Sequence, residues 1–268
     1  MINKYLFFAI AMLGMFSCQQ VIDINLNESA PQFVFEAALE EGTHDFKVRA
    51  TKTGNYFSTE APTPIKDAII KLSTEQGGEL LLNNENNGYY TLNQYAALNN
   101  TDYKLTIQTE GKTFMASSYL PKSVVLDSVS VEKNPPNPFG GEDKDSLFTL
   151  FCNFTDPKDE VNYYQIKSVV NGIPSSEGNQ ILVFDDRLTN GNKIRIPIFT
   201  REFKLGDVVE VYLLSIDKKT FDYFNTLLLI VSDGNSSAAP ANPISNWSDN
   251  ALGYFGAYSV SSLNVLVK

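Results

Sequence analysis

The first residues with a chemistry of their own are Ser17 and Cys18, which follow an apolar run over residues 6–16. That run is too short to cross a bilayer, which needs roughly 20 apolar residues, but it has the length of the apolar part of an export signal. A small side chain at Ser17 suits the tight pocket of a signal peptidase. The Cys18 thiol is the nucleophile that accepts a diacylglyceryl group. We therefore predict a lipoprotein signal peptide over residues 1–17, with an ordinary signal peptide and a coincidental cysteine as the alternative.

Lipid attachment at Cys18 would hold the protein at a membrane without a spanning helix. Each buried methylene group contributes about 0.8 kcal/mol, so several acyl chains on one cysteine, palmitate among them, bind firmly. Residues 18–22 then form a lipidated tether, and the globular part begins at residue 23. With Cys18 acylated, Cys152 has no partner for a disulfide. Its place in a strand-like run favours a small buried hydrophobic residue.

The single histidine, His44, limits the catalytic chemistry that the chain can perform. Zinc sites need several His or Cys ligands, and the sequence contains no Gly-Xaa-Ser-Xaa-Gly elbow of the serine hydrolases. Phosphate-binding glycine motifs are absent as well. We predict no catalytic residues, no metal site and no cofactor, and we interpret His44 as an exposed loop residue at a turn.

Acidic residues gather in three places, at residues 142–145, 156–160 and 185–186. Each group could supply oxygen ligands to calcium, although none has the spacing of a calcium loop with its central glycine and distal glutamate. Two such carboxylates at a suitable distance would also serve a glycosidase. Charged groups usually lie at the surface, which favours solvated turn residues. The sequence leaves calcium binding open.

Aromatic residues raise the question of sugar binding, since exposed rings can stack on sugars. Most of the 13 Tyr and 18 Phe residues fall within strand-like runs, where they fill a core or pair across strands. The only tryptophan, Trp247, lies in a loop-like segment over residues 243–247, which predicts an exposed ring. A single aromatic residue is a weak signal for a sugar site, and we favour core packing for the others.

The charge and composition of the chain exclude some partners. The formal net charge is −10, from 31 acidic and 21 basic residues, which argues against binding to nucleic acid and against electrostatic binding to anionic lipid headgroups. A hydrophobic fraction of 43% is ordinary for a globular protein. We expect a folded domain structure rather than disorder.

Alternation with a period of two dominates the first half of the chain. Tyr103, Leu105 and Ile107 alternate with polar residues, and Glu110-Gly111 then forms the type of pair that closes a tight hairpin. Short strands at regular spacing with Gly and Asn between them are typical of a sandwich or barrel. We predict an immunoglobulin-like β-sandwich over residues 23–121.

The second half, residues 122–268, is predicted to be a further β-rich, sandwich-like domain with one covering helix near residues 218–232. Asp217 can cap that helix, apolar residues recur at helical spacing up to Val231, and Gly234 can close the end. We expect the helix to cover an open end or face of the second sheet. A last pair of strands over residues 253–267 should pack into the body. The fold class is therefore mainly all-β.

Several segments, in a fixed order, resemble one known family. They are Val21-Ile22-Asp23-Ile24-Asn25-Leu26 after the cysteine, Pro64-Ile65-Lys66-Asp67-Ala68, Tyr103-Lys104-Leu105-Thr106-Ile107 before Gly111-Lys112, Asp127-Ser128-Val129, Pro240-Ala241-Asn242-Pro243-Ile244-Ser245-Asn246, and Ala251-Leu252-Gly253-Tyr254-Phe255-Gly256-Ala257-Tyr258. The chain is similar over nearly its whole mature length to the Bacteroidota lipoproteins grouped as domain of unknown function 4249 (DUF4249).

The resemblance implies a β-rich outer-membrane lipoprotein that is often encoded beside TonB-dependent receptors and has no established catalytic residues. It leaves open which face of the outer membrane the protein occupies. Two serines, Ser128 and Ser146, lie in Asp-Ser-apolar triplets that resemble an O-glycosylation site of the same phylum.

Our leading hypothesis is a non-catalytic accessory lipoprotein that docks on a TonB-dependent outer-membrane receptor or helps it capture substrate. Two alternatives remain, an extracytoplasmic hydrolase with paired carboxylates and a purely structural envelope lipoprotein. The hydrolase would need a cleft lined by inward-facing acids.

Overall fold

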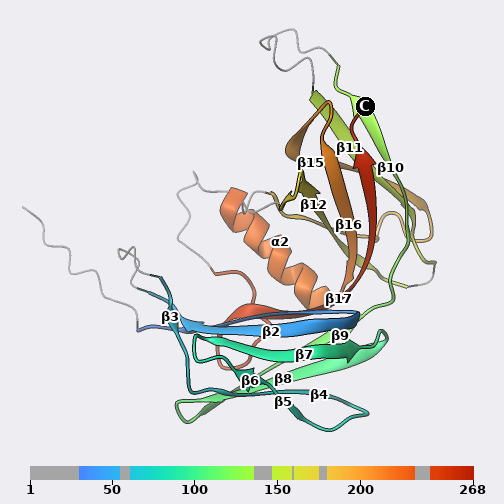
Figure 1. The fold of residues 1–268 in the computed structure, drawn as a ribbon. Helices are drawn as coiled ribbons and strands as arrows, with labels where there is room; N and C mark the ends of the chain where they lie inside the picture. The colour runs from blue at the N-terminus through green and yellow to red at the C-terminus, as the bar shows by residue number, and fades with distance from the viewer. Residues whose placement is uncertain (1–29, 55–60, 136–146, 159, 175–179, 233–241) are drawn as a thin grey trace, which may run out of the picture. The chain divides into compact units, whose positions relative to one another are not determined.

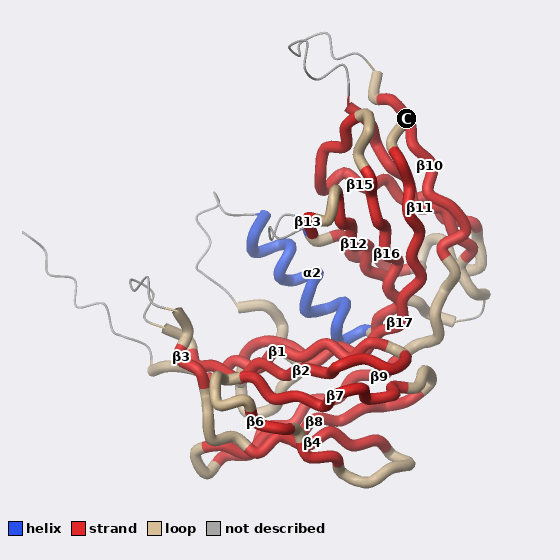
Figure 2. Tube along the Cα trace, viewed as in Figure 1, coloured by secondary structure: helices blue, strands red, loops and turns tan. Residues whose placement is uncertain are grey.

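A computed structural model describes the chain over residues 30–54, 61–135, 147–158, 160–174, 180–232 and 242–268. The chain divides into a short leading unit, Met1–Ala30, and a body, Pro31–Lys268. Figure 1 shows the body with its strands numbered in chain order, and Figure 2 shows that strands predominate over helix. The mainly β fold that the sequence predicts is confirmed.

Nine strands make up the described part of the first half of the body. They are β1 (Phe33–Glu40), β2 (Gly42–Lys52), β3 (Thr63–Pro64), β4 (Ile69–Thr74), β5 (Leu80–Leu81), β6 (Asn83–Asn84), β7 (Tyr89–Ala97), β8 (Thr101–Thr109) and β9 (Lys112–Leu120). The hairpin between β8 and β9 forms as expected, because Glu110 and Gly111 both adopt the positive φ, 48° and 73°, that a two-residue turn of this kind requires.

In the residues described for the second half, seven strands and a helix precede a last strand that returns to the first half. They are β10 (Leu126–Lys133), β11 (Leu147–Thr155), β12 (Tyr163–Val170), β13 (Ile173–Pro174), β14 (Leu182–Asp185), β15 (Lys193–Lys204), β16 (Val208–Ile216), α2 (Lys218–Ser232) and the last strand β17 (Leu252–Leu266). The predicted helix is confirmed. The expected pair of strands near the C-terminus is wrong, because one continuous strand of 15 residues takes its place.

A single sheet, which we call the long sheet, runs through both halves in the order β13-β12-β16-β17-β1-β2-β7-β6. The strand β17 joins the halves because its first part pairs in parallel with β1 and its second part pairs antiparallel with β16. At the changeover, Tyr258 lies between Glu40 on one side and Ile216 on the other. The division at residue 121 stays a prediction, and the sheet itself continues across both halves.

Two smaller sheets complete the two sandwich-like halves. The sheet β5-β4-β8-β9 encloses a first core with the long sheet, and the sheet β10-β11-β15 encloses a second. Along β17, Phe255 points into the first core and Val265 packs against the second. Because side chains alternate along a strand, both cores lie on one face of the long sheet, and Tyr254 and Tyr258 point to the opposite face.

The helix α2 lies on that opposite face (Figure 1). The predicted cap is confirmed, since the Asp217 carboxylate accepts a hydrogen bond of 2.8 Å from the Thr220 amide. The other Asp217 oxygen accepts one of 3.1 Å from the Tyr119 amide on β9, so the same side chain ties the helix to the first half. The helix approaches closely at Gly256, where a Cβ atom would lie only 2.8 Å from Thr220 Oγ1.

Aromatic contacts hold the rest of α2 against the sheet. The Tyr223 ring stacks on Tyr254 at 4.7 Å between centroids, and Phe221 lies 5.1 Å from Tyr163 on β12. The helix therefore covers strands of both halves, not the second half alone. Its far end is open, because Leu229 and Val231 are exposed. Within the described part of the chain, no helix has both the length and the apolarity needed to cross a membrane.

Candidate functional site

Two of the three residues predicted to carry modifications, Cys18 and Ser146, lie outside the described residues. The third, Ser128, is exposed on β10, at the edge of its three-stranded sheet. Its backbone oxygen accepts a hydrogen bond of 3.3 Å from the Asn153 side chain. An exposed hydroxyl on an edge strand is accessible to an enzyme, and glycosylation at Ser128 stays a prediction.

His44 is exposed as expected, but it lies within β2 and not in a loop. The prediction of a turn was wrong because β2 begins at Gly42, directly after the tight connection from β1. The imidazole Nε2 lies 3.7 Å from the Glu40 carboxylate, and half of the His44 side chain is open to solvent.

Two residues of the acidic groups, Asp156 and Asp186, are buried, which corrects the expectation that these groups are solvated. The Asp156 carboxylate accepts hydrogen bonds from the Tyr164 hydroxyl and from the Gly191 amide. Asp186 accepts one of 2.9 Å from the Asn162 amide. Burial became possible because the two loops fold against each other and their donors replace water.

These buried acids do not form the cleft that a hydrolase with paired carboxylates would require. Both oxygens of Asp156 are occupied by donors, and neither Asp156 nor Asp186 lines either of the two pockets described below. Among the described residues, no three His, Cys, Asp or Glu side chains are grouped so that they could hold a metal ion. The acidic residues 142–145 lie outside the described part of the chain.

Trp247 is buried, and the prediction of an exposed ring was wrong. Its indole Nε1 donates a hydrogen bond of 3.0 Å to the Phe35 backbone oxygen, and the two rings lie 5.2 Å apart. The segment around it folds onto β9, where the Ser248 amide donates to the Met115 oxygen at 2.9 Å. The loop-like segment therefore covers the first core, and the buried Trp247 ring cannot stack on a sugar.

Cys152 is a free, buried thiol in the second core, as its strand-like surroundings predicted. Burial raises the pKa of this thiol to about 12. The reactive thiolate is then present in roughly one molecule in ten thousand at about pH 8, against a sizeable fraction for a free cysteine. We expect Cys152 to resist iodoacetamide in the folded protein and to react rapidly in denaturant, as measured by mass spectrometry. Rapid labelling of the folded chain near pH 8 would contradict the burial of this side chain.

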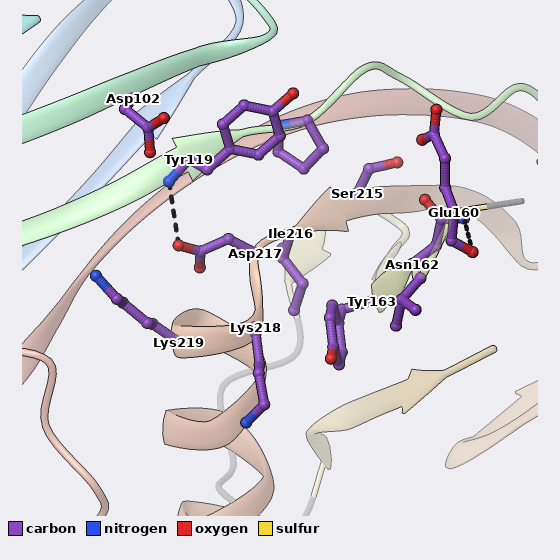
Figure 3. A pocket seen from close by; sticks show the side chains of 12 residues that line it. Asp102, Tyr119, Glu160, Asn162, Tyr163, Ser215, Ile216, Asp217, Lys218 and Lys219 are labelled. Carbon is purple, nitrogen blue, oxygen red and sulfur yellow. Dashed lines mark hydrogen bonds between the residues drawn. The ribbon is translucent and has the colours of Figure 1, made fainter. Parts of the chain in front are cut away.

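One pocket, which we call the helix-start pocket, lies beside the first turn of α2 and has a volume of about 350 Å³ (Figure 3). Most of its charged groups have partners. The Asp217 carboxylate is directed at the Tyr119 amide, Lys218 pairs with Asp222 at 2.6 Å, and Lys219 donates to Ser117 Oγ at 2.6 Å. Because Asp217 already caps the helix, the first turn offers little to an anion. These contacts are structural.

A second pocket, which we call the helix-side pocket, lies on the open face of the long sheet beside α2 and has a volume of about 460 Å³. Five strands and the helix contribute to it. The side chains that concern us are Glu40 from β1, Lys167 from β12, Tyr212 and Leu214 from β16, Tyr258 and Val260 from β17, Phe224 from α2, and Gln180 from the connection before β14.

The charged groups of the helix-side pocket are held close together without forming an ion pair. The Lys167 Nζ atom lies 5.7 Å from the centre of the Tyr258 ring, and the Tyr258 hydroxyl donates a hydrogen bond of 3.1 Å to Glu40 Oε2. Surrounding protein lowers the pKa of Lys167 by desolvation, and the Glu40 charge opposes that effect. Burial, together with Glu40, raises the pKa of Tyr258. Both effects keep the Tyr258 hydroxyl protonated, so it acts as a hydrogen-bond donor.

A further polar atom of the pocket has no partner. The side-chain oxygen Oε1 of Gln180 is buried and accepts no hydrogen bond. Buried acceptors are normally satisfied, so this oxygen is an exception among the residues that line the pocket. Apolar walls from Leu214, Val260 and Phe224 surround these polar groups. Such a mixture of apolar lining and a few oriented polar groups is typical of a ligand-binding pocket.

Sequence reasoning missed the helix-side pocket for a physical reason. Lys167 is an exposed residue of β12, and the sequence of this strand alone does not show which residues lie beside it. It shares a pocket with Glu40 because the sheet order brings β1 beside β17, and α2 borders the same space. A charged strand face followed by a strongly aromatic helix was the only signal in the sequence.

One comparison with known proteins bears on this arrangement. The model of a protein family described as domain of unknown function (DUF4249) matches residues 19–264. Among curated proteins, none matches the chain. The matched range includes every residue named above in both pockets, and the family's description assigns no catalytic activity.

Proposed function

This chain belongs to the DUF4249 family, and from that premise we propose that it is a non-catalytic, lipid-anchored outer-membrane protein that serves a TonB-dependent transporter as an accessory or substrate-capture partner. The observation that carries the proposal is the helix-side pocket. It is open to solvent, it combines apolar walls with oriented polar groups, and it lies on a face of the long sheet that neither core uses.

The chemistry of the pocket supports binding over catalysis. The Tyr258 hydroxyl donates to Glu40 and the Tyr258 ring lies beside Lys167 Nζ, so the tyrosine positions the two charged groups. Among the described residues that line it, no histidine or cysteine stands beside a serine or a carboxylate to make a nucleophile and its base. A site of this kind can hold and release a ligand, which is what capture for a transporter requires.

The anchor supports the location that we propose. Cys18 is followed by residues 19–32, which separate the lipid attachment point from β1. Fully extended, a segment of this length reaches about 46 Å, since a residue spans about 3.3 Å. That reach would let the body contact a neighbouring membrane protein while its lipid remains in the bilayer.

The proposed partnership predicts a physical complex. Affinity purification in mild detergent, through a tag placed after Lys268, is expected to recover an outer-membrane receptor of the TonB-dependent class together with this protein. The matched control is the Cys18→Ser chain with the same tag, which should recover much less receptor because it lacks the anchor. Recovery of the lipoprotein alone, with its anchor intact, would count against the partnership.

A further inference from the structure

The helix-side pocket presents one positive and one negative group that face the same space. Lys167 belongs to β12 and Glu40 to β1, and two other strands of the long sheet, β16 and β17, lie between them. Neighbouring strands are about 4.8 Å apart, so the two backbones are separated by roughly 14 Å. Both side chains lean toward Tyr258, whose ring lies near the ammonium and whose hydroxyl binds the carboxylate.

The position of Tyr258 leaves both charges available. In the described part of the chain, Lys167 forms no ion pair and donates no hydrogen bond to another side chain, and its Nζ atom lies beside the Tyr258 ring. An ammonium group has three donors, so most of its capacity is unused. Glu40 accepts one hydrogen bond from Tyr258, and its second oxygen has only the His44 ring at 3.7 Å.

The balance of these charges selects the charge of a ligand. An anion would be attracted by Lys167 but repelled by Glu40. A cation would be attracted by Glu40 but repelled by Lys167. A molecule with both charges satisfies the two groups at once.

The walls of the pocket select the body of the ligand. Leu214, Val260 and Phe224 border the same space, and Ile181 and Pro174 extend the apolar surface. A ligand made only of hydroxyl groups would leave these walls in contact with polar atoms. The apolar side chain of a zwitterion would instead cover these apolar walls and remove them from water.

We propose that the helix-side pocket binds a small zwitterion with an apolar side chain, its carboxylate at Lys167 and its ammonium group at Glu40. This is the chemistry shared by free α-amino acids and by short peptides. The two sources differ in the distance between their charged ends. The inference specifies the substrate class of the proposed capture function and rests on it.

The test measures binding calorimetrically with the full-length chain in detergent. The probes are L-leucine, L-phenylalanine, Leu-Leu and Phe-Phe, with N-acetyl-L-leucine, L-leucinamide and N-acetyl-L-leucinamide as analogues that lack one or both charges. We expect at least one zwitterion to bind about tenfold or more tightly than every blocked analogue of leucine, because each analogue leaves a pocket charge unpaired. Tighter binding of the dipeptides would assign a peptide, and tighter binding of the single residues a free amino acid.

Variants locate the binding to this pocket. Lys167→Met is expected to weaken the zwitterion about tenfold and to remove the advantage of leucine over leucinamide, while Glu40→Gln should remove its advantage over N-acetyl-leucine. Lys104→Met and Glu75→Gln, both exposed in the first half, are the matched controls and should bind as the unaltered chain does. Circular dichroism confirms that each variant is folded.

Two results would overturn the inference. One is the absence of measurable binding by all four zwitterions, and the other is equal binding of leucine and its doubly blocked analogue. Neither result touches the anchor or the receptor complex. Conversely, zwitterion binding by a chain that recovers no receptor would refute the proposed partnership and leave the pocket's ligand class intact.

Discussion

Replacement of Cys18 by serine is expected to abolish the incorporation of labelled palmitate and to move the protein from the membrane fraction to the soluble fraction. A serine hydroxyl does not replace the thiol that accepts the diacylglyceryl group. The loss should be nearly complete, because each acyl methylene contributes about 0.8 kcal/mol to membrane binding and the variant carries none. Metabolic labelling followed by fractionation of the cells measures both effects.

Cys152→Ser is the matched control for this experiment. Cys152 is buried in the second core, and burial raises its pKa to about 12, so it cannot serve as a second attachment point. The control should retain both the label and the membrane location. Labelled palmitate on the Cys18→Ser chain, or unchanged sedimentation with membranes, would refute the lipoprotein assignment.

Truncation of Trp247 to alanine is expected to lower the free energy of unfolding by about 3–5 kcal/mol. The indole is buried against Phe35, with their rings 5.2 Å apart, and donates to the backbone oxygen of β1. Its removal leaves a cavity in the first core and an unpaired carbonyl. The same segment binds β9 through Ser248, so the closure of that edge of the core should also loosen.

Chemical denaturation monitored by circular dichroism measures the free energy of unfolding of every variant. Tryptophan fluorescence would not serve, because Trp247 is the only tryptophan and its replacement removes the signal. Trp247→Phe keeps most of the ring and loses only the donor, so its cost should be about 1–3 kcal/mol. Leu188→Ala, at a side chain that is 97% exposed, should cost little. A Trp247→Ala chain as stable as the Leu188→Ala chain would mean that the indole does not support the core.

Local features of this protein follow directly from short stretches of sequence. The Glu110-Gly111 pair predicts the turn between β8 and β9 because its backbone requirement involves only those two residues. Asp217 predicts the start of α2 for the same reason, since a cap needs one carboxylate and the amides of the next turn. Alternation of apolar residues likewise predicts the strands and which of their faces are buried, because side chains alternate along any strand.

Long-range pairing explains why other predictions were wrong. Trp247 lies 212 residues from Phe35, and no local signal shows that its loop closes a core. Asp156 and Asp186 are buried because two loops meet and supply each other's hydrogen-bond donors. The last strand is continuous because β1 and β16 offer it two different edges, one after the other.

The sequence by itself determined the strand-rich fold class and the place of the helix, and it predicts the export signal that ends at Cys18. Each of these depends on residues within a few positions of one another. Only the tertiary structure decided that Lys167, Glu40 and Tyr258 share one pocket. They come from three strands whose places are set by the order of the long sheet, and α2 borders the same pocket from a fourth position in the chain. The order of the strands depends on which faces of the sheet are buried against the two cores. That burial involves residues far apart in the sequence, so no short stretch reveals it.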